Sequence, residues 1–285
     1  MSMNPENLPF KKNKILVSLI HNNNQDRLLI IKPNIDKLIF ELRKNNNVEF
    51  SEISWQPNLE PVSHKLGFFR DLMYWKLNRE WTKYRENKNL FLIFDFFLFI
   101  LRMIKKYIFN SNITRNWLQS CAIELFVSSK HINAYKIALE NKADYLLVFE
   151  DDAIFKEESL NKLVGLSNNL EINDKSPIYI DLGGGCNFNE LKIDNLELRR
   201  DKNFRYYKKP VTNTACCYLV NQEQLKLFNN YLVKNPILRY IGIDWLLNKM
   251  FIMQSKAGVV STCFHADPHF FNHGSVTGQF KPWVR

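Results

Sequence analysis

Apolar and polar residues alternate along the chain in blocks that predict strands and helices in turn. Residues 15–20 are apolar and rich in β-branched side chains, which predicts a buried strand that ends at His21 and the three asparagines after it. Apolar positions recur at helical spacing over 35–42, and residues 48–53 predict a second strand. The chain therefore begins as a β-α-β unit.

The same alternation resumes after residue 120. It predicts a helix near 130–140, a strand at 145–149, a helix at 159–170 and a strand at 178–182. Such a succession predicts an α/β, Rossmann-like domain with a mostly parallel central sheet covered by helices. The 285 residues are 46% hydrophobic with only 9 Gly and 10 Pro, which favours one large domain and excludes a disordered chain.

Residues 61–117 do not fit the alternation and predict a helical insertion rich in aromatic and basic side chains. Its apolar centre, LFLIFDFFLFIL at 90–101, is shorter than the about 20 residues that cross a bilayer. Two interpretations stay open. The helix packs on the sheet with Asp95 and Arg102 at its wet edge, or it lies in a membrane interface with its bases on anionic headgroups.

The net charge and the cysteine content indicate which partners and which cellular compartment to expect for the protein. The net charge of +10 indicates an anionic partner, which can be a nucleic acid, a membrane surface or a phosphorylated small molecule. The five cysteines show no CxxC pair or metal-ligand spacing, so we predict reduced thiols in a cytoplasmic protein. Residues 1–11 are polar, lack the apolar stretch of a signal peptide and predict a flexible start. Peripheral contact with the inner face of a membrane remains compatible with this location.

Three consecutive acids, Glu150, Asp151 and Asp152, follow directly on the apolar strand at 145–149. Open α/β sheets bind ligands at this edge, and three adjacent carboxylates need a cation or hydrogen bonds to offset their repulsion. Glu150 and Asp152 point to the same side of an extended backbone, so they can hold Mg²⁺ or Mn²⁺ against a diphosphate. The alternative is an exposed strand-to-helix turn with Asp152 near an N-cap.

The stretch SSKHINAYKIALENKADYLLVFEDDAIF, at 128–155, resembles the central block of glycosyltransferase family 25, the lipopolysaccharide-type galactosyltransferases. The Asp26-Arg27 pair and the segment TNTACCYLVNQEQLKLF are similar to other, less specific pieces of that family. Asp244 in YIGIDWLLN falls at a third, although Gly-Ile precedes it where the family has Pro-Val. The insertion at 61–117 is not a feature of the family.

The resemblance implies a fold and a reaction. It predicts a GT-A-like glycosyltransferase domain over 12–285 that depends on Mn²⁺ or Mg²⁺ and transfers a sugar with inversion. The donor would be UDP-galactose, and the acceptor a glycan or lipid-linked glycan, as in lipopolysaccharide biosynthesis; nucleic acid is not expected as a partner. The resemblance also gives Asp244 the role of catalytic base toward the acceptor hydroxyl, although aspartate at a helix start is also a common N-cap.

The remaining candidate site residues are further metal ligands and donor-binding residues. Three histidines cluster near the C-terminus, and the resemblance implies that a late one completes a metal shell with Glu150 and Asp152: His273 first, His269 second. The predicted donor-binding residues are Arg27, Ser129, His131, Asp151, Gly183, Gly184 and Lys281. A purely structural role stays open for several of them, because a serine can cap a helix, a glycine run can be only a turn and a lysine can be solvated.

Two other functions compete with glycosyl transfer. A metal-dependent phosphodiesterase or nuclease also needs clustered acids and would explain the basic charge, but it normally gathers further ligands around two metals. A basic membrane-associated binding module would explain the helix at 90–101 but not the acids at the strand end.

Overall fold

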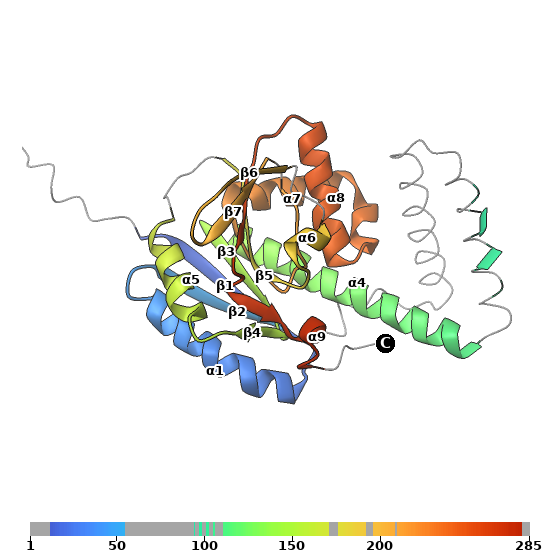
Figure 1. The fold of residues 1–285 in the computed structure, drawn as a ribbon, viewed down its shortest axis with the longest axis horizontal. Helices are drawn as coiled ribbons and strands as arrows, with labels where there is room; N and C mark the ends of the chain where they lie inside the picture. The colour runs from blue at the N-terminus through green and yellow to red at the C-terminus, as the bar shows by residue number, and fades with distance from the viewer. Residues whose placement is uncertain are drawn as a thin grey trace, which may run out of the picture.

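The computed structural model describes residues 12–54, 111–170, 176–191, 196–208 and 210–280, together with six positions between 94 and 105. Residues 1–11, most of the predicted insertion at 61–117, and Lys281 lie outside the described residues. The last part of the predicted insertion, 111–117, is helical. The other described residues form one large sheet with helices on both faces (Figure 1).

The sheet has the strand order β2-β1-β3-β8-β5-β9-β7-β6, and β10 pairs with both β5 and β4. The strands are β1 (Lys14–Ile20), β2 (Asn47–Ile53), β3 (Tyr145–Glu150), β4 (Ala153–Phe155), β5 (Ile178–Gly184), β6 (Glu197–Arg200), β7 (Phe204–Tyr207), β8 (Cys217–Asn221), β9 (Thr262–Ala266) and β10 (Phe271–His273). The predicted α/β class is confirmed, and every strand that the sequence predicted is present.

The sheet is mixed: most strands share one direction, as expected, and β4, β7 and β8 run the opposite way. Strands β2, β1 and β3 are parallel, as are β5 with β9 and β10. Strand β8 runs antiparallel to both β3 and β5, and β7 runs antiparallel to β6 and β9. A parallel neighbour needs a crossover connection, usually a helix, whereas β6 and β7 form a hairpin and β8 follows them through a loop.

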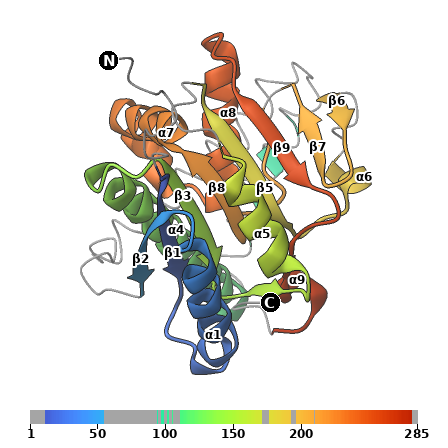
Figure 2. The same cartoon turned by 90° about the vertical axis from the view of Figure 1, so that its left-hand side faces the viewer.

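Two helical layers cover the sheet (Figures 1 and 2). Alternate strand residues such as Val17 and Leu147 pack under α1 and α5, whereas Leu16 and Val148 pack under α4, α7 and α8. The helices are α1 (Gln25–Leu42), α4 (Ser111–Glu140), α5 (Ser159–Asn168), α6 (Phe188–Leu191), α7 (Gln222–Lys234), α8 (Ile243–Lys256), α9 (Gly274–Thr277) and the 3₁₀ helix η4 (Pro236–Tyr240). The predicted helices at 35–42 and 130–140 are the last parts of the longer α1 and α4.

Five of the six described positions near residue 100 are exposed. Phe94, Phe97 and Leu101 are 64%, 58% and 61% exposed, and Arg102 and Lys105 are exposed as well. Among the helices of the described ranges, none is long and apolar enough to cross a membrane.

Candidate active site

The predicted acids lie at the carboxyl end of β3, where the sheet brings the C-terminal part of the chain beside them. The five residues of β3 before Glu150 are buried and apolar, so the strand is anchored in the core up to its last residue. Strand β10 pairs antiparallel with β4, which places His273 opposite Ala153, and the Gly274 amide donates to the Asp152 carbonyl over 2.8 Å. The strand pairing therefore brings His273 to the acidic turn.

Glu150, Asp152 and His273 form a group with the chemistry of a metal site. One ligand atom from each residue lies within 4.8 Å of the ligand atoms of the other two. Among the described residues, this is the one group of potential metal ligands that lie so close together. Asp152 Oδ1 and His273 Nδ1 are buried without a hydrogen-bond partner, which is costly unless a ligand compensates them. Two carboxylates and an imidazole are a suitable donor set for Mn²⁺ or Mg²⁺, so the residues present fit the predicted ion.

Burial sets the electrostatics of this group. Asp151 and Asp152 are only 5% and 4% exposed, which excludes the alternative of an exposed turn. Burial, and then the neighbouring Asp152, raises the pKa of Glu150 to about 8, while His273 opposes the shift. A cation bound among these groups would stabilise their charged forms. Ser275 adds a hydrogen bond to Asp152 Oδ2 over 2.5 Å and so fixes that carboxylate from α9.

Arg27 and Asp151, both predicted to bind the donor, bind each other. Arg27 is 3% exposed and its guanidinium donates to Asp151 Oδ1 over 2.8 Å, while Asp151 Oδ2 accepts from the Asn22 amide over 3.2 Å. Asn24 caps α1 by accepting from the Arg27 amide, so the start of α1 holds the guanidinium in place. The pair fastens the loop between β1 and α1 to the acidic turn, and Asp151 stays beside the metal group without joining it.

Ser129 and His131 lie inside α4, because that helix begins at Ser111, long before the predicted start. The Ser129 hydroxyl donates to the Leu125 carbonyl one turn earlier, so it caps no helix. His131 is completely buried, and its Nε2 lies 2.9 Å from Glu150 Oε1. His131 thus contacts a proposed metal ligand, Ser129 bonds within its own helix, and donor binding by either stays a prediction.

Gly183 and Gly184 face protein atoms. A Cβ on Gly183 would lie 2.7 Å from Cys216 Sγ, and one on Gly184 would lie 2.0 Å from His269 Nε2. The close approach that we expected for a ligand is thus made by the protein's own side chains. His269 fills the space over Gly184 and packs against Phe188 with a ring separation of 4.9 Å, so it is not a member of the metal group.

Asp244 lies in the first turn of α8, where Gly242 is the N-cap residue. Its pKa is raised to about 6 by burial and then by Glu150, while His273 and the Ala215 amide oppose the shift. It lines a cavity of about 200 Å³ together with Glu150 and His273. A carboxyl group that titrates near neutral pH beside a predicted metal site has the chemistry of a general base.

The loop before β8 places the Ala215 backbone next to Asp244. The Asn213 amide donates to buried Asp181 over 2.8 Å, and Thr214 takes a left-handed φ of 72° before Ala215 lines the cavity. Holding a β-branched residue in this conformation costs about 1–3 kcal/mol, and such strain persists only where surrounding contacts impose it. The hydrogen bonds of Asp181 and Asn213 therefore fix the backbone that faces Asp244.

Comparisons with known proteins leave the family open. No protein-family model and no curated protein matches the chain. Among solved structures it is similar to a glycosyltransferase involved in the glycosylation of the major capsid of PBCV-1. The identity is 10%, the TM-score is 0.31, and the match covers 79% of this chain and 68% of that one. A similarity of this strength carries no chemistry, and the resemblance to family 25 stays a prediction.

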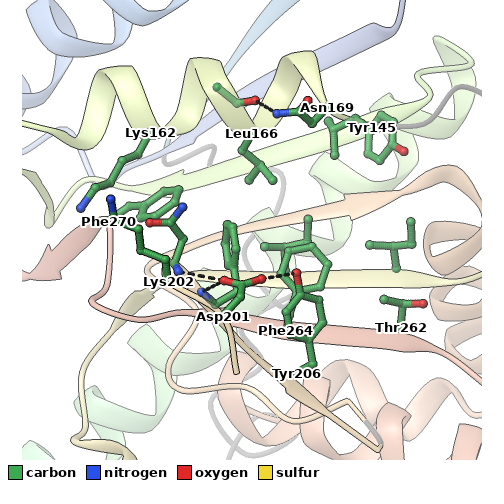
Figure 3. Close-up of a pocket in the computed structure, with 16 residues that line it drawn as sticks. Tyr145, Lys162, Leu166, Asn169, Asp201, Lys202, Tyr206, Thr262, Phe264 and Phe270 are labelled. Atoms are coloured by element: carbon green, nitrogen blue, oxygen red, sulfur yellow. Dashed lines mark hydrogen bonds between the residues drawn. The ribbon is translucent and has the colours of Figure 1, made fainter. Parts of the chain in front are cut away.

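A larger groove lies elsewhere on the molecule. It measures about 610 Å³ and runs along the sheet between α5 and the β6–β7 hairpin, over the starts of β3, β5 and β9 (Figure 3). Its lining is mainly apolar and aromatic, including Leu166, Phe204, Phe264 and Phe270. None of the acids and histidines of the metal group lines this groove.

Sequence reasoning missed two residues of the site. Trp245, which follows Asp244 in an apolar stretch, is 52% exposed and lines the cavity beside Asp244. Ser275, which hydrogen-bonds Asp152, carries no signal beyond its position two residues after His273. The run of apolar residues after Trp245 concealed which side of the helix faces the cavity.

Proposed function

We propose that the protein is a metal-dependent glycosyltransferase that uses a nucleotide sugar as donor. The observation that carries this proposal is the convergence of Glu150, Asp152 and His273 on one point, at a cavity that Glu150 and His273 line together with Asp244. A one-ion site next to a general base provides the two functions that sugar transfer needs, which are stabilisation of a diphosphate leaving group and deprotonation of an acceptor.

Glu150, Asp152 and His273 would hold Mn²⁺ or Mg²⁺. When bound, the ion would neutralise the negative charge that develops on the nucleotide diphosphate as it leaves. The hydrogen bond from Ser275 holds the Asp152 carboxylate in place for the ion. The buried Arg27–Asp151 pair fixes the acidic turn that carries it.

The acceptor side of the reaction depends on Asp244 and Trp245. Asp244 takes the proton from the acceptor hydroxyl as that oxygen attacks the anomeric carbon from the face opposite the leaving group, which gives inversion. Trp245 offers an exposed indole at the same cavity, on which the apolar face of a sugar ring can stack. The resemblance to family 25 makes UDP-galactose the expected donor and a glycan or lipid-linked glycan the expected acceptor.

The number of metal groups favours this function over a nuclease. The described residues offer a single group suited to a metal, whereas two-metal nucleases need a second.

Membrane contact belongs to the same proposal. Phe94, Phe97 and Leu101 are exposed at helical spacing, with Arg102 and Lys105 exposed next to them. Apolar side chains flanked by bases suit an anionic membrane interface, where a lipid-linked acceptor would be found. Flotation with phosphatidylserine vesicles tests this, and substituting Phe94, Phe97 and Leu101 together by Ser should abolish it. Retained flotation would rule out this surface.

A thermal-shift screen of nucleotide sugars with Mn²⁺ tests the donor class, because a ligand that binds the folded state raises its apparent stability. We expect UDP-galactose to raise the Tm with Mn²⁺ present and much less after EDTA treatment. Product analysis with the stabilising donor then identifies the transferred sugar. The proposal fails if no nucleotide sugar shifts the Tm while a nucleic acid is cleaved in the presence of Mg²⁺.

A further inference from the structure

Glu150 is the first member of a chain of buried hydrogen bonds that runs into the core. His131 Nε2 lies 2.9 Å from Glu150 Oε1, and its Nδ1 lies 2.8 Å from the Tyr218 hydroxyl. The Tyr218 hydroxyl in turn lies 2.8 Å from that of Tyr135. His131 and Tyr135 are one turn apart on α4, Tyr218 is on β8, and all three are at most 1% exposed.

The chemistry of these groups allows one consistent direction of donation. His131 is completely buried, which disfavours a charged ring, and a neutral imidazole carries one N–H. A carboxylate that holds a cation can only accept, which places the proton of His131 on Nε2. Nδ1 then accepts from the Tyr218 hydroxyl, and the Tyr218 oxygen accepts from the Tyr135 hydroxyl. Every hydroxyl and ring nitrogen in the chain is satisfied in this direction.

Packing holds the chain rigid. The rings of His131 and Tyr218 are stacked, with centroids 5.7 Å apart and planes 15° apart. The Glu150 amide donates to the Cys216 carbonyl over 2.8 Å, so β3 and β8 are fastened together at the point where the chain crosses between them. One Glu150 oxygen is thus committed to His131, which leaves the other for a ligand on the cavity side.

We propose that Tyr135, Tyr218 and His131 form a positioning chain that fixes the tautomer of His131 and thereby the orientation of the Glu150 carboxylate toward the metal site. This inference rests on the proposed function and deepens it. His131 was predicted to bind the donor, and the inference gives it the role of a positioning residue. Tyr218, which touches neither the cavity nor the other metal ligands, becomes a determinant of metal affinity.

The test is the Mn²⁺ affinity of Tyr218→Phe, measured by calorimetry and by the electron paramagnetic resonance of free Mn²⁺. The substitution keeps the buried ring and removes one hydroxyl, so that His131 Nδ1 loses its donor. We expect the Kd for Mn²⁺ to rise by about tenfold, the effect typical of losing an outer-shell partner. Tyr135→Phe, one bond further from Glu150, should raise it less.

Tyr179→Phe is the matched control. Tyr179 is equally buried on β5, and its hydroxyl bonds to Asp181 and Thr212 without contacting Glu150 or His131. Its Mn²⁺ affinity should equal that of the wild type, even if its Tm falls as much as that of Tyr218→Phe. Equal affinities in the two variants would overturn the inference. If Tyr218→Phe does not fold, Tyr135→Phe against Tyr179→Phe makes the same comparison.

The ¹⁵N chemical shifts of His131 separate this inference from the proposed function. We expect the Nε2–H tautomer in the wild type under conditions in which Glu150 is ionised, and a mixture of tautomers in Tyr218→Phe under the same conditions. If the wild type binds no Mn²⁺, the metal function fails, and these shifts, recorded with Glu150 ionised, decide the role of the chain in orienting Glu150. An imidazole whose tautomer is the same in both proteins would overturn the inference whether or not metal binds.

Discussion

Two cavities in the described part of the chain differ in size and in chemistry. The groove beside α5 has a volume of about 610 Å³ and the cavity beside β3 about 200 Å³. In the groove, the carboxylate of Asp201 is satisfied by the Tyr206 hydroxyl and by two backbone amides (Figure 3). At the small cavity, Asp152 Oδ1, Asp244 Oδ1 and His273 Nδ1 are buried without a hydrogen-bond partner, and His273 Nδ1 lies 3.4 Å from Asp152 Oδ2. The gathering of three such atoms at one place, rather than volume, makes the small cavity the candidate site.

The strongest test of this comparison is the same Asp→Asn substitution at the small cavity and in the groove. Asp152→Asn should weaken Mn²⁺ binding by more than the about 10–100-fold that loss of an outer-shell residue costs, because it removes a ligand, and transfer should fall with it. Asp201→Asn, in the groove, should change neither. Metal titration of the two variants measures both effects. Equal losses would show that the groove is part of the site.

Asp244→Asn should separate catalysis from metal binding. We expect the transfer rate to fall by about 10²–10⁴-fold, the contribution of a general base, while the Mn²⁺ affinity stays close to that of the wild type.

The pH dependence of transfer gives a second readout of Asp244. Burial, followed by Glu150, raises its pKa to about 6, and the base must be ionised to accept a proton, so wild-type activity should rise as pH increases through about 6. Asp244→Asn should lose this limb of the profile. A wild-type limb centred near the ordinary aspartate value of 4 would contradict the buried placement of Asp244.

The pair behind the acidic turn can be tested through stability. Arg27→Met leaves the buried Asp151 carboxylate without its partner, which should cost about 3–5 kcal/mol of unfolding free energy. Urea denaturation measures this, and adding Asp151→Asn to the same chain should recover much of the loss because no buried charge then remains unpaired. If the single variant is as stable as the wild type, the pair does not fasten the turn.

Trp245→Ala should have the smallest effect. We expect the KM for the acceptor to rise by about tenfold, the equivalent of one aromatic contact of about 1.5 kcal/mol, with the KM for the donor unchanged. Trp245→Phe should retain most of the affinity because it keeps an aromatic face. Saturation kinetics for each substrate distinguish the two, and a change confined to the donor would place Trp245 on the other side of the reaction.

The sequence predicted the strands of the core and the position of the acids because both depend on local pattern. The strand at 145–149 is a continuous apolar run because it is buried on both faces, and Glu150 and Asp152 are simply the residues that follow it. His273 entered through the resemblance, and β10 confirms its place beside these acids. Local pattern is thus sufficient where one element determines the environment of a residue.

The rest depended on contacts between distant segments. Nothing near His131 shows that Tyr218 will lie against its ring, or that the space over Gly184 is filled by His269. The antiparallel direction of β8 follows from the path of the chain after the β6–β7 hairpin, which no periodicity encodes. The exposure of Trp245 likewise depends on how α8 is rotated against the sheet.

The most direct test of the account is to locate the ion. Anomalous diffraction at the manganese edge, from crystals soaked in Mn²⁺, should show a single peak bonded to Glu150, Asp152 and His273, on the cavity side of β3 and next to Asp244. A saturated crystal without a peak at this position, in which these three side chains contact only one another, would contradict the central claim.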